Sequence, residues 1–385
     1  MAQGSLPQNY IGREQAFVKH RILKTYLERL FMIVGMTKEP IINFVDCFSG
    51  PWQEEDEKLS DTSIGISLEQ MNRCKGILQH KFGREVTFRA LFIEENSAAF
   101  MKLSRFLEEN HHPHIETHCI NSDYSEVTDE IIGWCGGHFS FLFLDAKGWD
   151  VGMQKIRPLL QMENCELLIN LMYDFINRFV NVEDQSDTMI DLFGEVPDLS
   201  DVSPDQRHQT LVNLYRSHMN TEYRGRTSFV DIEDPGKDRI LYNLIYLTRH
   251  PLGIGVFKAE SEKLDLVQRV TQMETKLRKQ QESKGMDDLF GVVHALATEA
   301  KEDNRNLAKG YLMKLLGNGP VKIDHNCWAD LLEESNLYPR DFQIAMKELL
   351  KDKVVENIDA DTSRRRTNFI KPGYPNKSES WKLCR

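Results

Sequence analysis

The sequence predicts an α/β protein with a mainly parallel β-sheet, followed by a smaller helical domain. Two observations lead to this class. Short apolar segments alternate with helical stretches through the first half of the chain, and each stretch is long enough to connect two parallel strands. Residues 286–385 contain helical stretches and little apolar strand pattern, which indicates a second, separate unit.

Size and composition limit the class of protein further. The chain has 385 residues, enough for two or three compact units, and its 41% hydrophobic and 28% charged residues exclude a disordered or fibrous protein. No apolar run approaches the ~18 residues of a membrane span, and no secretory signal is visible. The 7 cysteines are scattered without a CxxC pair, which favours reduced thiols. We therefore expect a cytoplasmic protein that does not associate with membranes.

The first elements form a regular series. Apolar side chains recur at helical spacing over residues 13–35, which predicts a helix. Five segments rich in Phe, Ile, Leu and Val then predict strands: Ile41–Cys47, Thr87–Glu94, Ile115–Ile120, Phe139–Asp145 and Glu166–Met172. Crossover helices are predicted between them: Ser63–Leu78, Ser97–Glu109, Ser125–Cys135 and Met153–Met162. In such a sheet a ligand binds outside the carboxyl ends of the strands.

Two further segments close the predicted sheet. Asn243–Thr248 and Gly255–Lys258 are separated by only Arg249–Gly253, which is too short for a crossover, so they are expected to pair antiparallel. Five parallel strands and a closing hairpin are the layout of the seven-stranded class I methyltransferase sheet, a Rossmann-type fold. We expect this domain to occupy residues 1–260.

The C-terminal part predicts a winged helix. Residues 261–285 are charged and helix-prone and predict a helical linker, and residues 286–385 predict the small domain. Its expected helices and wing strands are Tyr311–Leu316, Trp328–Glu334, Arg340–Leu350, Val354–Ile358 and Thr367–Ile370. The net charge of −11 argues against general nucleic-acid affinity, but the basic tail offers a local contact for DNA or RNA through Arg364, Arg365 and Arg366. Protein binding by this domain, or packing on the main domain, is an equal alternative.

The turn after the first strand is a candidate cofactor site. Asp46 ends the strand, and Phe48, Ser49 and Gly50 form a small-residue turn whose backbone can approach a ligand closely. The sequence has neither the G-x-G-x-x-G of dinucleotide enzymes nor a P-loop, so NAD-dependent redox chemistry and P-loop hydrolysis are disfavoured.

Acidic residues also end the next two strands. Glu94 stands where a ribose diol can donate hydrogen bonds to it, and Asp123 where an adenine amino group can donate. Each acid alone is equally well explained as a helix N-cap. Acids at successive strand ends together favour an adenosine-type ligand.

Short motifs spread over about residues 15–260 carry a family resemblance: Lys19-His20-x-x-Leu23-x-x-Tyr26-Leu27, Val45-Asp46-x-Phe48-Ser49-Gly50-Pro51, Asp61-Thr62-Ser63, Phe92-Ile93-Glu94, Phe143-Leu144-Asp145-x-x-Gly148, Glu166–Met172 with Arg178, and Tyr246–His250. Together they resemble the three-Cys-motif partner proteins. The resemblance implies a bacterial protein with a class I methyltransferase-like domain, and S-adenosylmethionine as its cofactor. It also implies a partner encoded nearby that carries three clustered cysteines and is of the radical-S-adenosylmethionine type.

The sequence departs from the family pattern at two motifs. Trp52 replaces the last glycine of Phe-Ala-Gly-Pro-Gly, where it can crowd or stack on the methionine end of a ligand. The fourth strand is followed by Asp145-Ala146-Lys147-Gly148 in place of Asp-Pro-Phe-Gly. Neither form is the Asp/Asn-Pro-Pro-Tyr box of base methylation, so adenine-N6 or cytosine-N4 methylation is not supported.

The candidate chemistry is methyl transfer. Asp145 is the candidate to orient or deprotonate an acceptor, and Lys147 either compensates an anionic substrate or pairs with Asp145. Arg178 binds a substrate phosphate or carboxylate, or only caps a helix with Asp174. We expect no metal site. The leading hypothesis is an S-adenosylmethionine-dependent methyltransferase of unknown acceptor, with nucleic acid or a nucleotide slightly favoured, and the alternative is a non-catalytic adaptor with the same fold.

Overall fold

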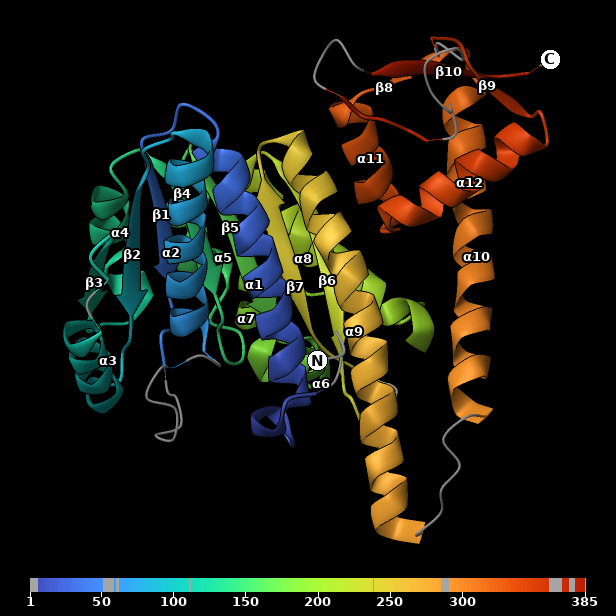
Figure 1. The fold of residues 1–385 in the computed structure, drawn as a ribbon. Coiled ribbons are helices and arrows are strands. Elements are labelled where there is room, and N and C mark those ends of the chain that lie inside the picture. The colour runs from blue at the N-terminus through green and yellow to red at the C-terminus, as the bar shows by residue number, and fades with distance from the viewer. Residues whose placement is uncertain are drawn as a thin grey trace. The chain divides into compact units, whose positions relative to one another are not determined.

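The chain forms two compact units, one of residues 6–249 and one of residues 250–385 (Figure 1). The computed structural model describes residues 6–50, 59, 62–110, 112–237, 239–284, 291–359, 369–373 and 378–384. Trp52 and Arg364 to Arg366, singled out in the sequence, lie outside these residues.

A seven-stranded sheet is the centre of the first unit. Its strands are β1 (Ile41–Asp46), β2 (Thr87–Ile93), β3 (Ile115–Ile120), β4 (Phe139–Leu144), β5 (Cys165–Leu171), β6 (Arg226–Glu233) and β7 (Ile240–Thr248). They lie in the order β3-β2-β1-β4-β5-β7-β6, and β7 runs antiparallel to both of its neighbours. This is the class I methyltransferase arrangement, so the predicted fold class is confirmed.

Helices cover both faces of this sheet. Their bounds are η1 (Gln8–Tyr10), α1 (Glu14–Gly35), α2 (Ser63–Phe82), α3 (Ser97–Glu109), η2 (Tyr124–Glu126), α4 (Thr128–Cys135), α5 (Met153–Leu160), α6 (Tyr173–Phe179), η3 (Glu183–Gln185), α7 (Ser186–Phe193) and α8 (Pro204–Tyr223). Figure 1 shows α1 and α2 in front of the sheet, with α5, α7 and α8 behind it.

The strands are apolar on both faces because both are buried. Val45, Leu142 and Ile169 point into a core shared with α4, α5, α7 and α8. On the opposite face the ring of Phe141 stacks 6.2 Å from that of Phe44 and lies 5.7 Å from the Tyr26 ring of α1. Because side chains alternate along a strand, Asp46 shares the α1 face with Phe44.

The closing hairpin differs from the prediction. It consists of β6 and β7, whereas Gly255–Lys258 lies inside the long helix α9 (Pro251–Lys284). Proline suits the first turn of a helix, and the buried side chains of Ile254, Phe257 and Leu264 follow helical spacing. Residues 251–260, expected in the first domain, therefore begin the second unit.

The second unit pairs helices with a small antiparallel sheet. After α9 come α10 (Gly291–Leu316), β8 (Val321–Ile323), α11 (His325–Ser335), α12 (Pro339–Lys351), β9 (Val355–Asn357) and β10 (Glu379–Leu383). The sheet order is β8-β10-β9. The expected wing strand at 367–370 is wrong where it is described, since residues 369 and 370 are not in a strand. The strand that completes this sheet is β10, in which the Trp381 side chain is fully buried.

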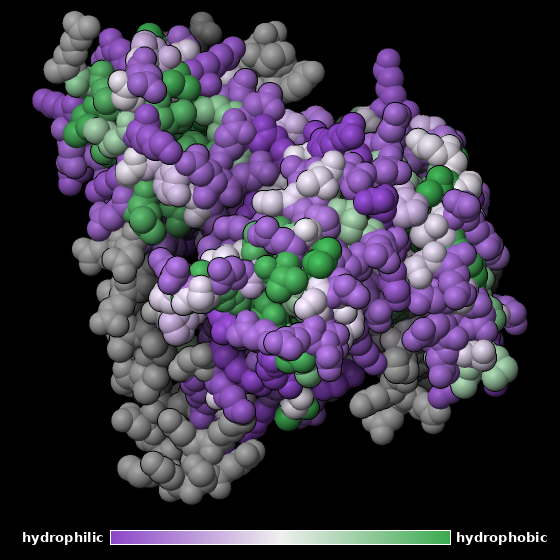
Figure 2. Space-filling model, turned by 180° about the vertical axis from the view of Figure 1, so that it is seen from behind, coloured by the Kyte–Doolittle hydropathy of each residue, from purple (hydrophilic) through white to green (hydrophobic). Residues whose placement is uncertain are grey.

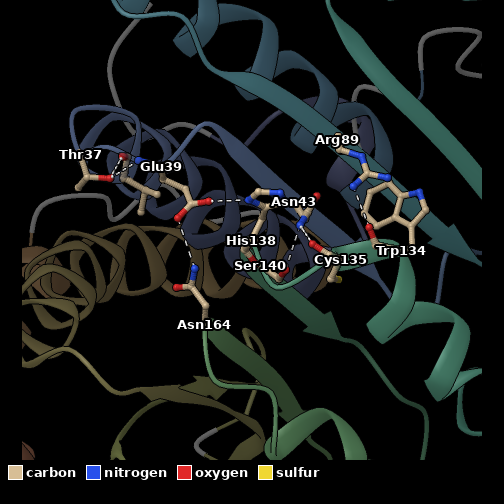
Figure 3. Close-up of polar contacts among 10 residues, drawn as sticks. Thr37, Glu39, Asn43, Arg89, Trp134, Cys135, His138, Ser140 and Asn164 are labelled. Carbon is tan, nitrogen blue, oxygen red and sulfur yellow. Dashed lines mark hydrogen bonds and ion pairs between the residues drawn. The ribbon is translucent and has the colours of Figure 1, made fainter.

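Polar contacts tie together the amino ends of the central strands (Figure 3). Glu39, just before β1, lies 3.1 Å from Nδ1 of His138, just before β4. The Asn43 side chain donates to the Cys135 carbonyl at 3.0 Å and to Ser140 Oγ at 3.1 Å. These contacts join the segments that enter β1 and β4, so this edge of the sheet has a structural role.

The face seen from behind in Figure 2 is mostly hydrophilic. Figure 2 shows the molecule from behind, where polar side chains are interrupted by small hydrophobic groups. Within the described residues, every helix is too short or too polar to cross a bilayer.

Candidate functional site

The turn after β1 is held by Asp46. The backbone N–H of Phe48 donates to Asp46 Oδ1 at 3.1 Å, and the Ser63 hydroxyl of α2 donates to Oδ2 at 2.5 Å. The Ser49 N–H donates to the Ile93 carbonyl at 2.8 Å, which ties the turn to β2. Asp46 is fully buried, so its part is to shape the predicted cofactor turn from beneath.

Burial also changes the acidity of Asp46. Loss of hydration raises its pKa from 3.8 to about 7, although the hydrogen bonds from Ser63 and Phe48 act in the opposite direction. The nearby carboxylate of Asp145 raises the pKa further, and Lys19 lowers it. Asp46 and Asp145 are therefore electrostatic neighbours at the carboxyl edge of the sheet.

Gly50 and Glu94 meet at this edge. A β-carbon at Gly50 would lie 2.2 Å from Oε2 of Glu94, so only glycine fits there without a shift. The Asn96 N–H donates to Oε1 of Glu94 at 2.7 Å and fixes the carboxylate. No described residue donates to Oε2, which leaves one oxygen for a ligand hydroxyl.

Asp123 follows β3 and is stabilised as an anion. Its Oδ1 accepts from Ser125 N–H at 2.8 Å and Ser125 Oγ at 2.9 Å, and its Oδ2 accepts from Lys155 at 3.4 Å. Burial alone would raise its pKa, but these donors outweigh burial and lower it. The rings of Phe48 and Tyr124 lie 5.0 Å apart, so the β1 turn packs beside this residue.

Asp145 follows β4 and forms an ion pair with Lys19 of α1. Asn170, in β5, donates through Nδ2 to Asp145 Oδ1 at 2.7 Å. Burial raises the pKa of Asp145, but the Lys19 cation and the Asn170 amide prevail, and the net pKa is lowered. Asp145 is therefore a held anion with a donor on each oxygen.

Uncommon buried groups surround this ion pair. Oδ1 of Asn170 is buried and accepts no hydrogen bond from the described residues, an arrangement that costs about 1–3 kcal/mol. Lys19 Nζ lies 5.9 Å from the centre of the Tyr242 ring. Burial, assisted by Lys19, lowers the pKa of His20 to about 3, so this imidazole is neutral.

The structure places two other predicted residues at the surface. Lys147 is exposed, and the cation beside Asp145 is Lys19. Arg178 is 61% exposed at its side chain and pairs with Asp174 one helical turn earlier, with its Nε donating to the Asp174 carbonyl at 3.0 Å. The helix-capping alternative for Arg178 therefore describes its contacts here.

Aromatic side chains cover the sheet edge after β4 and β5. The Trp149 ring lies 4.8 Å from Phe175 and 5.6 Å from Phe179, and the two Phe rings lie 5.1 Å apart. All three side chains are partly exposed. They form an aromatic wall at the carboxyl ends of β4 and β5.

Sequence reasoning assigned no role to Lys19, Ser63 or Asn170. All three lie in motifs that carry the family resemblance, which was the available signal. Their partners are 126, 17 and 25 residues away in sequence, so no local pattern indicates the contacts.

In the second unit, helix α12 was expected in the recognition position of a winged helix, with nucleic-acid reading and protein contact as equal alternatives. Its Gln343 side chain exchanges two hydrogen bonds of 2.8 Å with the backbone of Ile370. Its Glu348 accepts from Lys309 of α10 at 2.7 Å. Two polar side chains of this helix are thus engaged within the unit.

Three comparisons with known proteins were made. No family model and no curated protein matches the sequence. Among 15 matching chains of solved structures is a loganic acid methyltransferase with SAH, with 6% identity and a TM-score of 0.31, covering 74% of this chain and 95% of its own. At that TM-score the likeness carries no argument, and we base the interpretation on the chain's own residues.

Proposed function

We propose that residues 6–249 bind S-adenosylmethionine at the carboxyl edge of β1 and β2 and transfer its methyl group. The supporting observation is the approach of Gly50 to Glu94, where a β-carbon would lie 2.2 Å from the carboxylate. In a sheet of this topology, a glycine turn opposite an acid at the end of β2 suits a ribose.

The residues present fit the adenosine part of this cofactor. Glu94 has one oxygen fixed by Asn96 and one with no donor among the described residues, so it can accept from a ribose hydroxyl. Phe48 packs on Tyr124 and closes the apolar side of the turn. Asp123 is expected to accept from the adenine amino group, although Ser125 and Lys155 already donate to it.

The cofactor supplies an electrophilic methyl group on a sulfonium. In the transfer the acceptor atom forms a bond to the methyl carbon, the carbon–sulfur bond breaks, its electron pair stays on sulfur, and any acceptor proton passes to solvent or a base. The chain's task is to hold donor and acceptor in line and to exclude water. The aromatic wall of Trp149, Phe175 and Phe179 suits a planar acceptor, which keeps a nucleotide or nucleic acid as the favoured class.

The second unit is proposed to bind partner molecules. Its order of helix, strand, two helices and two strands is that of a winged helix. Proposed partners are a three-cysteine-motif protein and, through Arg364 to Arg366, DNA or RNA. The engagement of Gln343 and Glu348 within the unit favours protein binding over base reading by α12.

A non-catalytic adaptor is the second candidate. The ion pair of Asp145 with Lys19 supports it, because a carboxylate with a donor on each oxygen is poorly placed to take an acceptor proton. An adaptor that retains the fold is expected to bind its partner without turning over a methyl donor.

Calorimetry with S-adenosylhomocysteine tests cofactor binding. Glu94→Gln weakens binding about 10- to 100-fold, because a hydrogen bond to a charged group contributes about 1.5–3 kcal/mol. The control is Glu95→Gln, one residue later and exposed, which leaves binding unchanged. No heat with the wild-type protein at millimolar ligand contradicts cofactor binding. Binding without methyl transfer to nucleic acid, nucleotide or protein fractions favours the adaptor.

A further inference from the structure

The ion pair of Lys19 and Asp145 lies inside the molecule, across the sheet edge from Glu94. Its side chains are only 15% and 22% exposed, so both charges have lost most of their water. Stabilisation of the fold is a poor explanation for a pair in this position. The attraction between two partly buried ions offsets only part of the free energy that their desolvation costs.

Unused hydrogen-bonding capacity surrounds the same pair. The ammonium of Lys19 has three donors, and among the described residues Asp145 is the acceptor for one of them. Asn170 uses its amide nitrogen on Asp145, and its buried Oδ1 has no donor among the described residues. The cluster therefore offers an anion with an adjacent neutral acceptor, and a cation with free donors beside them.

A zwitterion is the complement of such a cluster. We propose that Asp145, Asn170 and Lys19 bind the amino-acid end of the methyl donor. The α-ammonium of the methyl donor replaces Lys19 as the partner of Asp145 and donates to Oδ1 of Asn170. The α-carboxylate of the methyl donor accepts from Lys19. The inference rests on the proposed function. That function is supported by a different observation, the approach of Gly50 to Glu94 at the expected ribose position.

The order of strands gives the required spacing. β1 lies between β2 and β4, so Glu94 and Asp145 stand at the ends of strands two positions apart. Strands lie about 4.8 Å apart, which separates these positions by roughly 10 Å. That span suits a nucleoside that carries a short amino-acid chain, with the ribose at β2 and the zwitterion at β4 and β5.

This assignment changes the role predicted for Asp145. A carboxylate whose pKa lies below the ordinary value is a weak proton acceptor, and Asp145 has donors on both oxygens. The ionisable groups that face it are Lys19 and His20 from α1 and Asp46 from β1. Asp145 therefore belongs with the methyl donor rather than with the acceptor.

Two ligands that differ only at the amino-acid end test the inference by calorimetry. S-Adenosylhomocysteine has the zwitterion, and 5′-methylthioadenosine lacks it. Lys19→Met and Asp145→Asn are each expected to weaken S-adenosylhomocysteine about 10- to 100-fold and to change methylthioadenosine less than twofold. Lys19→Arg retains most of the preference because it keeps the cation. Lys24→Met is the matched control: it lies on the same helix as Lys19, removes an exposed pair with Glu69 of α2, and is expected to change neither ligand.

The outcomes separate the two proposals. Equal losses for both ligands, or no loss for either in both variants, overturn the inference and leave adenosine binding intact. Binding of neither ligand to the wild-type protein overturns the proposed function and the inference with it. Thermal unfolding of each variant shows that the compared proteins are folded.

Discussion

The hydroxyl of Ser63 donates a 2.5 Å hydrogen bond to the buried carboxylate of Asp46. This contact joins the first residue of α2 to the last residue of β1. Asp46 also accepts from the Phe48 N–H, so one carboxylate holds the helix start and the turn together. Predictions about the turn therefore concern Asp46 and its donors first.

Removal of the donor destabilises the first unit in a pH-dependent way. Ser63→Ala leaves a buried carboxylate oxygen without its partner, which costs about 1–3 kcal/mol or more when the group is charged. We expect a larger loss of unfolding free energy at pH 8 than at pH 5, measured by urea denaturation. Ser67→Ala, which removes an intrahelical bond to the Ile64 carbonyl, is the control, and its effect is the same at both pH values. A pH-independent loss for Ser63→Ala contradicts the prediction.

Asp46 itself makes stability fall as pH rises. Its pKa is raised from 3.8 to about 7 by burial, so the folded state binds the proton more tightly than the unfolded state between these values. The cost is absent below about pH 3.8 and complete above about pH 7, where it reaches on the order of 4 kcal/mol. Asp46→Asn cannot ionise, and we expect its stability relative to wild type to improve steadily from pH 4 to pH 8. Parallel stability curves for the two proteins would show that Asp46 stays ionised when folded.

Gly50→Ala is expected to impair ligand binding. The new β-carbon meets Glu94 Oε2 at 2.2 Å, and Asn96 holds the other oxygen of that carboxylate, so Glu94 has to leave its position. We expect at least a tenfold loss of S-adenosylhomocysteine affinity by calorimetry. Gly76→Ala in α2 has open space around its β-carbon and is expected to raise stability by about 1 kcal/mol with unchanged affinity. Equal affinity for Gly50→Ala and wild type would argue against a ligand in this turn.

The sheet was predictable because its strands are buried on both faces. Residues such as Phe141 to Leu144 form apolar runs bounded by turns, and the observed β1 to β5 start within one residue of the predicted strands. β6 was missed because polar residues such as Ser228 and Asp231 interrupt it, so it lacks the continuous apolar run of the inner strands. Gly255–Lys258 was misread because a short apolar run fits a strand or a buried helix equally well. The length of α9 shows that this run belongs to a helix, but a short stretch of sequence does not reveal that length.

The site was only half predictable for a related reason. The topology alone places Asp46, Glu94 and Asp145 at one edge, since parallel strands end together. The sequence does not indicate that Lys19, 126 residues before Asp145, neutralises it. Long-range pairing depends on how α1 packs on the sheet, and the local pattern constrains only which face of α1 is apolar.

Trp381 is the test of the second unit's sheet. Its side chain is fully buried in β10, which replaces the strand expected at 367–370. Trp381→Ala is expected to cost about 3–5 kcal/mol and to unfold residues 291–384 at a lower temperature, measured by calorimetry. Phe369→Ala is the control, because its side chain is 51% exposed and its loss is expected to change stability by less than about 0.5 kcal/mol. A larger effect for Phe369 than for Trp381 would restore the strand predicted from the sequence.

His20 opposes Asp46 in the pH dependence of stability. Burial, Lys19 and Arg13 lower its pKa from 6.5 to about 3, although Asp145 raises it, so the folded state excludes a proton that the unfolded state binds. Stability therefore rises with pH between about 3 and 6.5, opposite in sign to the Asp46 effect. The two slopes partly cancel in the wild-type protein. His20→Gln removes the rise of stability with pH that His20 causes. We therefore expect the stability of the variant relative to wild type to be greater at pH 4.5 than at pH 8. The difference is a few kcal/mol at most, at roughly 1.4 kcal/mol per pKa unit. Urea denaturation at five pH values measures this difference. If the variant gains stability relative to wild type as pH rises, His20 is not a neutral, buried group in the folded protein.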